Sequence, residues 1–273
     1  MRFSQVDVFS SEPLLGNPVA VVHDADDVSE EEMAAFARWT NLSETTFLLA
    51  PTQPGADYRL RIWTPGGELP FAGHPTLGSA HAWLEAGGVP AGEGALVQEC
   101  AAGLVTVRTG ERLSFAAPPL TRSGPVDDAD VAAACHALGI EPGEVVDAAW
   151  IDNGPGWMGV LLGDADAVLA VEPDWAAFGD LKIGVVGEYP DGPVAVEVRA
   201  FCPGYGMPED PVTGSLNAGV GQWLAGSRLP ASYIASQGTV LGRAGRVHVE
   251  TADGQVWVGG DTATTITGVV GLD

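Results

Sequence analysis

The sequence repeats one of its own motifs half a chain apart. Arg61-Ile62-Trp63-Thr64-Pro65-Gly66 returns as Arg199-Ala200-Phe201-Cys202-Pro203-Gly204, a shift of 138 (199 − 61). His74-Pro75-Thr76-Leu77-Gly78-Ser79 returns as Asp210-Pro211-Val212-Thr213-Gly214-Ser215, a shift of 136 (210 − 74). Both shifts are close to half of the 273 residues. Such self-similarity indicates an internal duplication, so we predict two similar lobes.

Each copy of the motif predicts a strand, a turn and a helix. Apolar residues alternate through Tyr58–Trp63 and Val194–Phe201, which is typical of strands. Pro-Gly then predicts a turn. His74-Pro75 and Asp210-Pro211 follow as expected helix starts, each with a polar N-cap and Pro at the first helical position.

The repeated helix starts are also candidate ligand sites. Gly and Ser in a first helical turn let a ligand approach the unpaired N–H groups, which favour an anion. A purely structural interpretation is that both segments are small-residue helix starts packed under a sheet. Because the feature is duplicated, we favour a site between the two lobes, where His74 and Asp210 hold opposite ends of one ligand.

Composition restricts the class of protein. Apolar residues make up 46% of the chain and charged residues 18%, as in a globular protein. The balance of 12 basic against 36 acidic residues gives a net charge of −24, which repels nucleic acid and anionic membranes. No apolar run approaches 18 residues, and the first residues alternate like a strand and lack a signal peptide's apolar core. We therefore expect a cytoplasmic protein.

Cysteine and histidine spacing gives no sign of a metal site. Cys100, Cys135 and Cys202 are far apart, which suits a reduced protein without disulfides or a thiolate metal centre. The five histidines show no paired ligand spacing. We interpret Cys202 as a packing residue and not as a nucleophile.

Glu44 is the acid whose position calls for an explanation. It lies where a loop enters the apolar segment Thr45–Leu49, directly after a helix that the capping box Ser29–Glu32 predicts to end near Asn41. One interpretation is that Glu44 faces solvent at the start of a strand. The other is a functional carboxylate.

The remaining pattern predicts many strands and few helices in each lobe. The best linker is Pro118–Pro125, so we place the lobes at residues 1–118 and 119–261. Asp127 to Leu138 reads as a helix that stops at Gly139. Further helices are expected over residues 71–86 and near 173–178, and strands over 18–22, 95–100, 104–108, 112–115, 145–151, 157–162, 182–186, 233–236, 246–250, 255–258 and 264–270. Strands and helices do not alternate regularly, which argues against a doubly wound sheet.

Several of these segments together resemble the PhzF family of phenazine-biosynthesis isomerases. They are Gly16-Asn17-Pro18, Asn41-Leu42-Ser43-Glu44-Thr45, Leu69–Thr76 and Pro208–Ser215, and they occur in order along the chain. The resemblance implies an α+β fold like diaminopimelate epimerase: two pseudo-symmetric lobes, each a curled, mostly antiparallel sheet or barrel around one central helix. It also implies that the final strand, within residues 262–273, returns to the first lobe.

The resemblance further implies an activity and a set of site residues. The type enzyme isomerises trans-2,3-dihydro-3-hydroxyanthranilate by moving a proton across the ring without a cofactor. Its acid/base carboxylate corresponds to Glu44, and its other catalytic positions correspond to His74 and Asp210. Substrate-binding positions fall on Ser43, Gly73, Gly214 and Ser215. A carboxylate in a weakly solvated cleft is suited to this chemistry, since it acts as base first and acid second. We expect a homodimer that binds a small molecule, with no cofactor and no metal.

Two other functions stay open at the level of sequence. One is an amino-acid epimerase or racemase; epimerases of this fold carry cysteines at the positions that His74 and Asp210 occupy here. The other is a small-molecule binding protein without turnover. Retention of Glu44 argues against the second alternative, because binding alone does not require an acid at the entrance of a strand.

Overall fold

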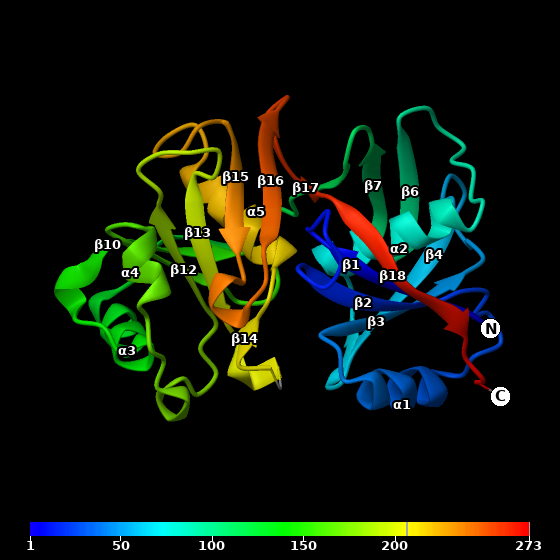
Figure 1. Cartoon of the computed structure of the whole chain (residues 1–273), viewed down its shortest axis with the longest axis horizontal. Coiled ribbons are helices and arrows are strands. Elements are labelled where there is room, and N and C mark those ends of the chain that lie inside the picture. Colours follow the sequence, from blue (N-terminus) through cyan, green and yellow to red (C-terminus); the bar gives the residue numbers. More distant parts are fainter. Residues whose placement is uncertain (206, 273) are drawn as a thin grey trace. The chain divides into compact units, whose positions relative to one another are not determined.

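The chain forms two units in the computed structural model, which describes residues 1–205 and 207–272. Unit 1 comprises Met1–Ala116 and Gly259–Asp273, and unit 2 comprises Ala117–Val258. Each unit has its own sheet and its own helices (Figure 1). None of the helices in the described ranges has the length and hydropathy of a membrane-spanning segment.

Unit 1 is a curved sheet with one helix on its concave side and one on the other. Its strands join in the order β18-β1-β2-β3-β4-β6-β7-β8, and β5 pairs with the end of β4. The pairs β2–β3 and β4–β6 are parallel, and the others in this series are antiparallel. The elements are β1 (Arg2–Val8), β2 (Asn17–Val22), α1 (Glu30–Thr40), β3 (Glu44–Leu49), β4 (Tyr58–Thr64), β5 (Gly67–Leu69), α2 (Gly73–Glu85), β6 (Ala95–Cys100), β7 (Gly103–Thr109), β8 (Leu113–Ala116) and β18 (Thr262–Val269).

Unit 2 repeats this strand order. Its strands join as β9-β10-β11-β12-β13-β15-β16, β14 pairs with the end of β13, and the parallel pairs are β11–β12 and β13–β15. The elements are β9 (Arg122–Pro125), α3 (Asp128–Leu138), η1 (Pro142–Glu144), β10 (Val145–Asp152), β11 (Met158–Leu162), α4 (Ala165–Leu169), η2 (Trp175–Ala177), β12 (Ile183–Glu188), β13 (Val196–Phe201), η3 (Pro203–Tyr205), β14 (Glu209–Asp210), α5 (Gly214–Leu224), β15 (Ser232–Gln237), η4 (Thr239–Leu241), β16 (Gly245–Ala252) and β17 (Gln255–Gly260).

The final strand of the chain returns to unit 1, after the residues that form unit 2. β9 follows β8 in the chain but pairs with β10 in unit 2. β18 follows β17 but pairs with β1 in unit 1, with the register Arg2↔Val269 to Val8↔Thr262 (Figure 1). Both chain ends meet there, because the Met1 amine donates to the Val270 carbonyl (2.8 Å). Asp273, the last residue of the expected return segment, lies outside the described residues.

A helix of small residues occupies the concave side of each sheet. The buried part of α2 includes Gly73, Thr76, Gly78, Ser79 and Ala80, and the helix packs against β1, β2, β3 and β8. A Cβ at Gly78 would come within 2.3 Å of Cγ1 of Val19, so only glycine allows this approach of helix and sheet. α5 is similarly buried and packs against β10 and β16. A helix buried on nearly all sides is the expected core of a curled sheet.

Helix caps confirm some of the predicted boundaries. Ser29 is the N-cap of α1 and forms the predicted capping box with Glu32. Asp127 caps α3, which ends at Gly139 in a left-handed conformation, as predicted.

Other predicted boundaries are wrong. Arg122–Pro125 of the expected linker is strand β9. The short helix expected near 173–178 is present as the 3-10 helix η2 (Trp175–Ala177), but α4 at Ala165–Leu169 was not predicted.

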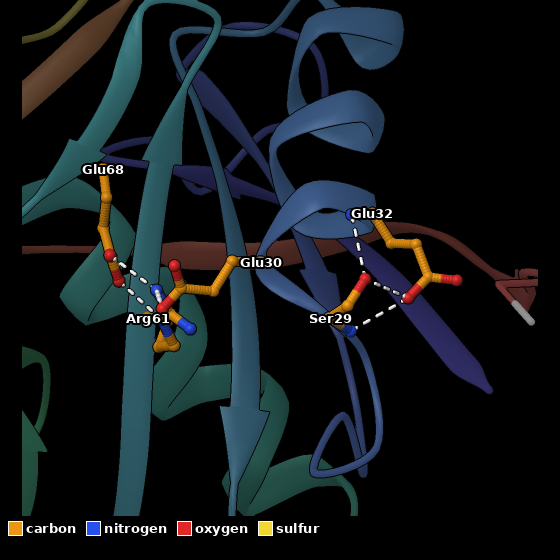
Figure 2. A network of polar contacts seen from close by, with 5 residues as sticks. All are labelled: Ser29, Glu30, Glu32, Arg61 and Glu68. Carbon is orange, nitrogen blue, oxygen red and sulfur yellow. Dashed lines mark hydrogen bonds and ion pairs between the residues drawn. The ribbon is translucent and has the colours of Figure 1, made fainter.

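The Arg-x-aromatic motif of the repeat forms the same pair of contacts in both units. In unit 1, Arg61 lies 5.4 Å from the ring of Trp63 and pairs with Glu68 across the β4–β5 hairpin, with Nε–Oε1 at 2.6 Å (Figure 2). In unit 2, Arg199 lies 4.8 Å from the ring of Phe201 and makes two bonds of 2.9 Å to Glu209. Residues i and i+2 of a strand share a face, so the arginine covers the aromatic ring and reaches across the hairpin.

The two arginines differ in their second contact. Figure 2 shows Arg61 reaching Glu30 in the first turn of α1 (2.9 Å). Arg199 instead donates to the carbonyls of Val168 (3.2 Å) and Val171 (2.7 Å), at and beyond the end of α4. Each arginine therefore fixes a helix that connects two parallel strands of its unit.

Candidate active site

Glu44 is the first residue of β3 and lies against the start of α2. Its side chain is 15% exposed, and its Oε2 lies 3.4 Å from Nδ1 of His74, which is 4% exposed. In the parallel register Glu44 pairs with Val19, the residue on which Gly78 packs. His74 lies one helical turn before Gly78, on the same face of α2. The tight helix–sheet contact thus brings the predicted carboxylate and imidazole together.

Hydroxyl contacts hold β3 in this position. Thr46 donates to the carbonyl of Ala20 (3.2 Å) and hydrogen-bonds the hydroxyl of Ser79 in α2 (2.8 Å). Thr45 hydrogen-bonds Thr40 at the end of α1 (2.8 Å). These two threonines follow Glu44 directly, so they fix the strand both to α2 and to the preceding helix.

His74 is neutral at pH 7. Burial lowers the pKa of the imidazole to about 3, although the carbonyl of Pro18 acts in the opposite direction. A neutral imidazole has one N–H donor and one acceptor nitrogen. The pair is therefore a carboxyl group beside an uncharged ring, and not an ion pair.

The structure corrects the role of His74 and Asp210 as helix starts. The N-cap of α2 is Ala72, so His74 is the second helical residue. The N-cap of α5 is Thr213, so Asp210 lies before the helix, in the two-residue strand β14. The two sequence copies are equivalent, but the helix begins five residues later in the second copy, at Gly214 and not at the position that corresponds to Gly73 (73 + 136 = 209). There, Asp210 accepts a hydrogen bond from the Thr213 hydroxyl (2.6 Å).

The remaining predicted residues of unit 1 flank this pair. Ser43 directly precedes Glu44 at the entrance of β3. Gly73 is the first residue of α2, and a Cβ there would come within 2.3 Å of the Phe115 ring. This glycine is thus required for the approach of α2 to β8, whatever its contact with a ligand.

The predicted residues of unit 2 lie at the start of α5. Gly214 is the first helical residue, and Ser215 follows it. The Trp157 indole N–H donates to Oγ of Ser215 (3.0 Å), and the amide of Asn153 donates to the Ser215 carbonyl (2.9 Å). Because Oγ accepts from the indole, the hydroxyl hydrogen of Ser215 can be donated to another group.

Sequence reasoning missed the residues that support this site. Trp157 and Asn153 belong to the segment Asn153-Gly154-Pro155-Gly156-Trp157, whose glycines and proline indicate a tight loop. Asp152 fixes that loop by accepting from the N–H groups of Gly154 (2.7 Å) and Gly156 (2.6 Å). The loop was visible in the sequence, but its contact with Ser215 depends on tertiary structure.

No group of three or more potential ligand side chains in the described residues could hold a metal ion. All three cysteines are buried thiols. Burial raises the pKa of Cys100 and of Cys135. Cys202 directly follows β13, and its thiol donates to the carbonyl of Met207 (3.8 Å).

Each unit, with its curled sheet, crossover helix and buried central helix, has the architecture of the proline racemase-like and diaminopimelate epimerase-like class. Solved structures share it: a PhzF-family protein from Enterococcus faecalis superimposes with a TM-score of 0.83 over 99% of both chains at 26% identity. A probable proline racemase from Agrobacterium radiobacter shares the fold alone (TM-score 0.58, 16% identity, 100% of this chain and 93% of that one).

Residues 6–268 match the family model of the phenazine biosynthesis-like proteins, PhzC-PhzF, and the chain belongs to this family. It is 37% identical to the trans-2,3-dihydro-3-hydroxyanthranilate isomerase of Pseudomonas aeruginosa, over 90% of this chain and 89% of that protein. It is also 38% identical to antisense-enhancing sequence 1 of Schizosaccharomyces pombe, over 97% of both chains. The protein is an isomerase of this family.

Proposed function

We propose that the protein isomerises a small cyclic or amino-acid-like carboxylic acid by moving one proton between two carbon atoms. The named substrate of the Pseudomonas relatives, trans-2,3-dihydro-3-hydroxyanthranilate, is of this kind. Such an isomerisation changes neither the composition nor the overall oxidation level of the substrate. It therefore needs a proton carrier and no electron acceptor, which supports a reaction without a cofactor.

The observation that carries the proposal is the contact between Glu44 Oε2 and His74 Nδ1 at 3.4 Å. In the proposed reaction, a Glu44 oxygen takes the proton from a substrate carbon, and the C–H electron pair moves into the ring π-system. The same oxygen then returns the proton to a second carbon. His74 stays neutral and lies beside the Glu44 carboxyl, where its imidazole can hydrogen-bond a substrate group. The two transfers balance, because one proton leaves and one proton returns.

Asp210 and Ser215 are proposed to bind the substrate. Asp210 is buried and, when ionised, only accepts hydrogen bonds, which suits an amine or hydroxyl group. Ser215 and the N–H groups at the start of α5 suit a carboxylate. Ser43, Gly73 and Gly214 are proposed as further contact positions.

The test is proton exchange with trans-2,3-dihydro-3-hydroxyanthranilate in D₂O. We expect the wild-type protein to convert the substrate and to incorporate deuterium at carbon, detected by NMR and mass spectrometry. Glu68→Gln is the matched control, because Glu68 also belongs to unit 1 but pairs with Arg61 in the β4–β5 hairpin. Exchange by Glu44→Gln at near the wild-type rate would show that Glu44 is not the proton carrier.

The epimerase alternative lacks support in the side chains. Positions 74 and 210 hold histidine and aspartate, and the cysteines are buried. The structural likeness to racemases, at 16% identity, concerns the fold alone. Incubation with a panel of amino acids, followed by chiral chromatography, is expected to leave their configuration unchanged.

We further propose a cytoplasmic homodimer. The three reduced, buried cysteines support a reducing compartment. Sedimentation equilibrium at several concentrations measures the oligomeric state, and a monomer at all of them would contradict the dimer.

A further inference from the structure

A fully buried glutamine in unit 2 connects β15 to the segment that carries Asp210. Gln237 is 0% exposed, and its Nε2 donates to the Asp210 carbonyl (3.1 Å) and to Thr213 Oγ1 (2.9 Å). Its Oε1 accepts from the Thr213 N–H (2.9 Å) and from the Asn217 amide (2.9 Å). All four hydrogen-bonding positions of the Gln237 side chain are thus used inside the protein.

These partners allow only one orientation of the Gln237 amide. A backbone carbonyl can only accept, so Nε2 must face Asp210, and a backbone N–H can only donate, so Oε1 must face Thr213. Thr213 Oγ1 therefore accepts from Gln237. Its single hydrogen is directed at Oδ2 of Asp210, which lies 2.6 Å away, a short distance typical of a hydroxyl that donates to a carboxylate.

We propose that Gln237 and Thr213 are positioning residues, which orient the Asp210 carboxylate by engaging its Oδ2 and its backbone carbonyl at the same time. The proposal rests on the binding role given to Asp210 above. Gln237 and Thr213 thereby determine how the Asp210 carboxylate is oriented toward a ligand, although neither side chain needs to contact the ligand.

Unit 1 contains a similar buried pair of glutamine and threonine, Gln98 and Thr76, which is not connected to a carboxylate in the described contacts. Gln98, which is also 0% exposed, donates from Nε2 to Thr76 Oγ1 in α2 (3.0 Å) and accepts from the Tyr58 hydroxyl (3.2 Å). In this unit the residue at the repeat position of Asp210 is His74. This pair thus offers a control, because a buried Gln–Thr bond can be broken there without touching Asp210.

Several charged residues lie on the elements packed around Asp210 and could influence its titration. Of the elements packed around it, α5 and β15 carry no charged residue. β13 and β14 contribute Glu197, Arg199 and Glu209, and the last two bind each other at 2.9 Å. Glu197 receives a hydrogen bond from Tyr189 (2.9 Å). On the other side of β15, Arg246 donates to the Ser236 hydroxyl (3.0 Å), and Arg243 and the Pro211 carbonyl both lie against Gly238. These charged residues are the same in wild type and in Thr213→Val, so a different midpoint in that variant reports on the hydrogen bond that it removes.

The test is a ¹³C NMR titration of the Asp210 carboxyl carbon, identified by its loss in Asp210→Asn. A hydrogen bond to the ionised form favours ionisation, so Thr213→Val should raise the titration midpoint by roughly one pH unit. Gln237→Glu should raise it as well, through the added negative charge and through redirection of the Thr213 hydroxyl, so Thr213→Val is the variant that decides. Thr213→Ser keeps the hydroxyl, and Thr76→Val breaks only the pair in unit 1, so both should leave the midpoint unchanged.

Activity gives the second measurement. With trans-2,3-dihydro-3-hydroxyanthranilate, kcat/KM should fall about tenfold in Thr213→Val and recover in Thr213→Ser. An unchanged Asp210 midpoint in folded Thr213→Val, accompanied only by a lower Tm, would overturn the positioning role. If the wild-type protein does not convert this substrate, the proposed function fails, whereas the NMR titration still decides the positioning role.

Discussion

Glu44 carries the proposed chemistry at the level of single residues. Glu44→Gln keeps the size and much of the hydrogen bonding of the side chain but removes its ability to carry a proton. We expect kcat to fall by roughly 10²–10⁴, with substrate binding mostly retained. Single-turnover kinetics and calorimetry separate the two effects. A variant that loses binding and keeps its rate at saturation would contradict the assignment.

His74 makes stability depend on pH. Its folded-state pKa of about 3 lies below the unfolded value of 6.5, so the unfolded chain binds the proton more readily. The stabilising contribution is therefore complete above pH 6.5 and is lost progressively as the pH falls toward 3. Burial also lowers the pKa of His23, which adds a change in the same direction.

The measurement is the free energy of unfolding between pH 4 and pH 7, in wild type and in His74→Asn. One proton contributes a slope of at most about 1.4 kcal/mol per pH unit. We expect the pH slope of the unfolding free energy to be smaller in His74→Asn than in wild type, by most of this one-proton value. Identical slopes would mean that the buried imidazole keeps an ordinary affinity for protons.

At the level of elements, the duplicated hairpin arginines make a matched comparison. Arg199 and Glu209 are 3% and 7% exposed, whereas Arg61 and Glu68 are 21% and 32% exposed. Arg199→Met leaves a buried carboxylate unpaired, which is expected to cost about 3–5 kcal/mol of unfolding free energy. Arg61→Met should cost about 0–1 kcal/mol because solvent screens the pair.

Urea unfolding of both arginine variants measures these losses. The double variants Arg199→Met/Glu209→Gln and Arg61→Met/Glu68→Gln are the controls. In unit 2, the additional Glu209→Gln change removes the unpaired carboxylate and should restore part of the lost stability. Equal losses in the two units would show that burial of the pair is not the cause.

Elements with local signals were predictable from the sequence, and elements fixed by distant residues were not. Ser29 with Glu32, and Asp127 with Gly139, mark the ends of α1 and α3 within the helices themselves. The start of α5 depends on Gln237, 24 residues further along, which binds Thr213 and keeps the preceding residues out of the helix. Local pattern therefore placed α5 one turn too early.

The site shows the same division between local and distant information. Glu44 stood out as an acid at the entrance of an apolar strand, and the repeat singled out His74 and Asp210. The contact between Glu44 and His74 requires β3 to lie on α2, through Thr46 and Ser79. Trp157 hydrogen-bonds Ser215, and Gln237 hydrogen-bonds the backbone of Asp210. These partners are distant in the sequence, so no local pattern predicts the contacts.

For the whole molecule, the pairing of β18 with β1 predicts that the C-terminal segment is required for unit 1. β18 pairs with β1 along its length, and His81 of α2 hydrogen-bonds both Thr262 (2.9 Å) and Thr264 (3.1 Å). At about 0.5–1.5 kcal/mol net for each ladder hydrogen bond, deletion of residues 262–273 should cost at least about 3 kcal/mol. It also leaves β1 as an open edge, so aggregation is expected.

Denaturant unfolding and light scattering of the truncated chain test this prediction. Removal of Gly271 to Asp273 alone is the control, since it leaves β18 and the Met1–Val270 contact in place. A truncated chain that unfolds with unchanged midpoint and stays monodisperse would show that β18 is dispensable.

The sequence duplication predicts that His74 and Asp210 bind the same ligand molecule. In a Glu44→Gln background, which prevents turnover, His74→Ala and Asp210→Ala should each weaken binding of trans-2,3-dihydro-3-hydroxyanthranilate by about 1–3 kcal/mol. Calorimetry on the single and combined variants measures these losses. Losses of a few tenths of a kcal/mol for each would mean that the two residues serve the fold alone.

The pairing of β18 with β1 also sets an order for folding during synthesis. β1 ends at Val8, but its partner β18 begins only at Thr262, so at roughly 5–20 residues per second it leaves the ribosome about 13–50 s later. Unit 2 has all its residues once Val258 is made. We therefore expect the second half of the sequence to complete its sheet first, while β1 in the nascent first half keeps one open edge that a chaperone can recognise.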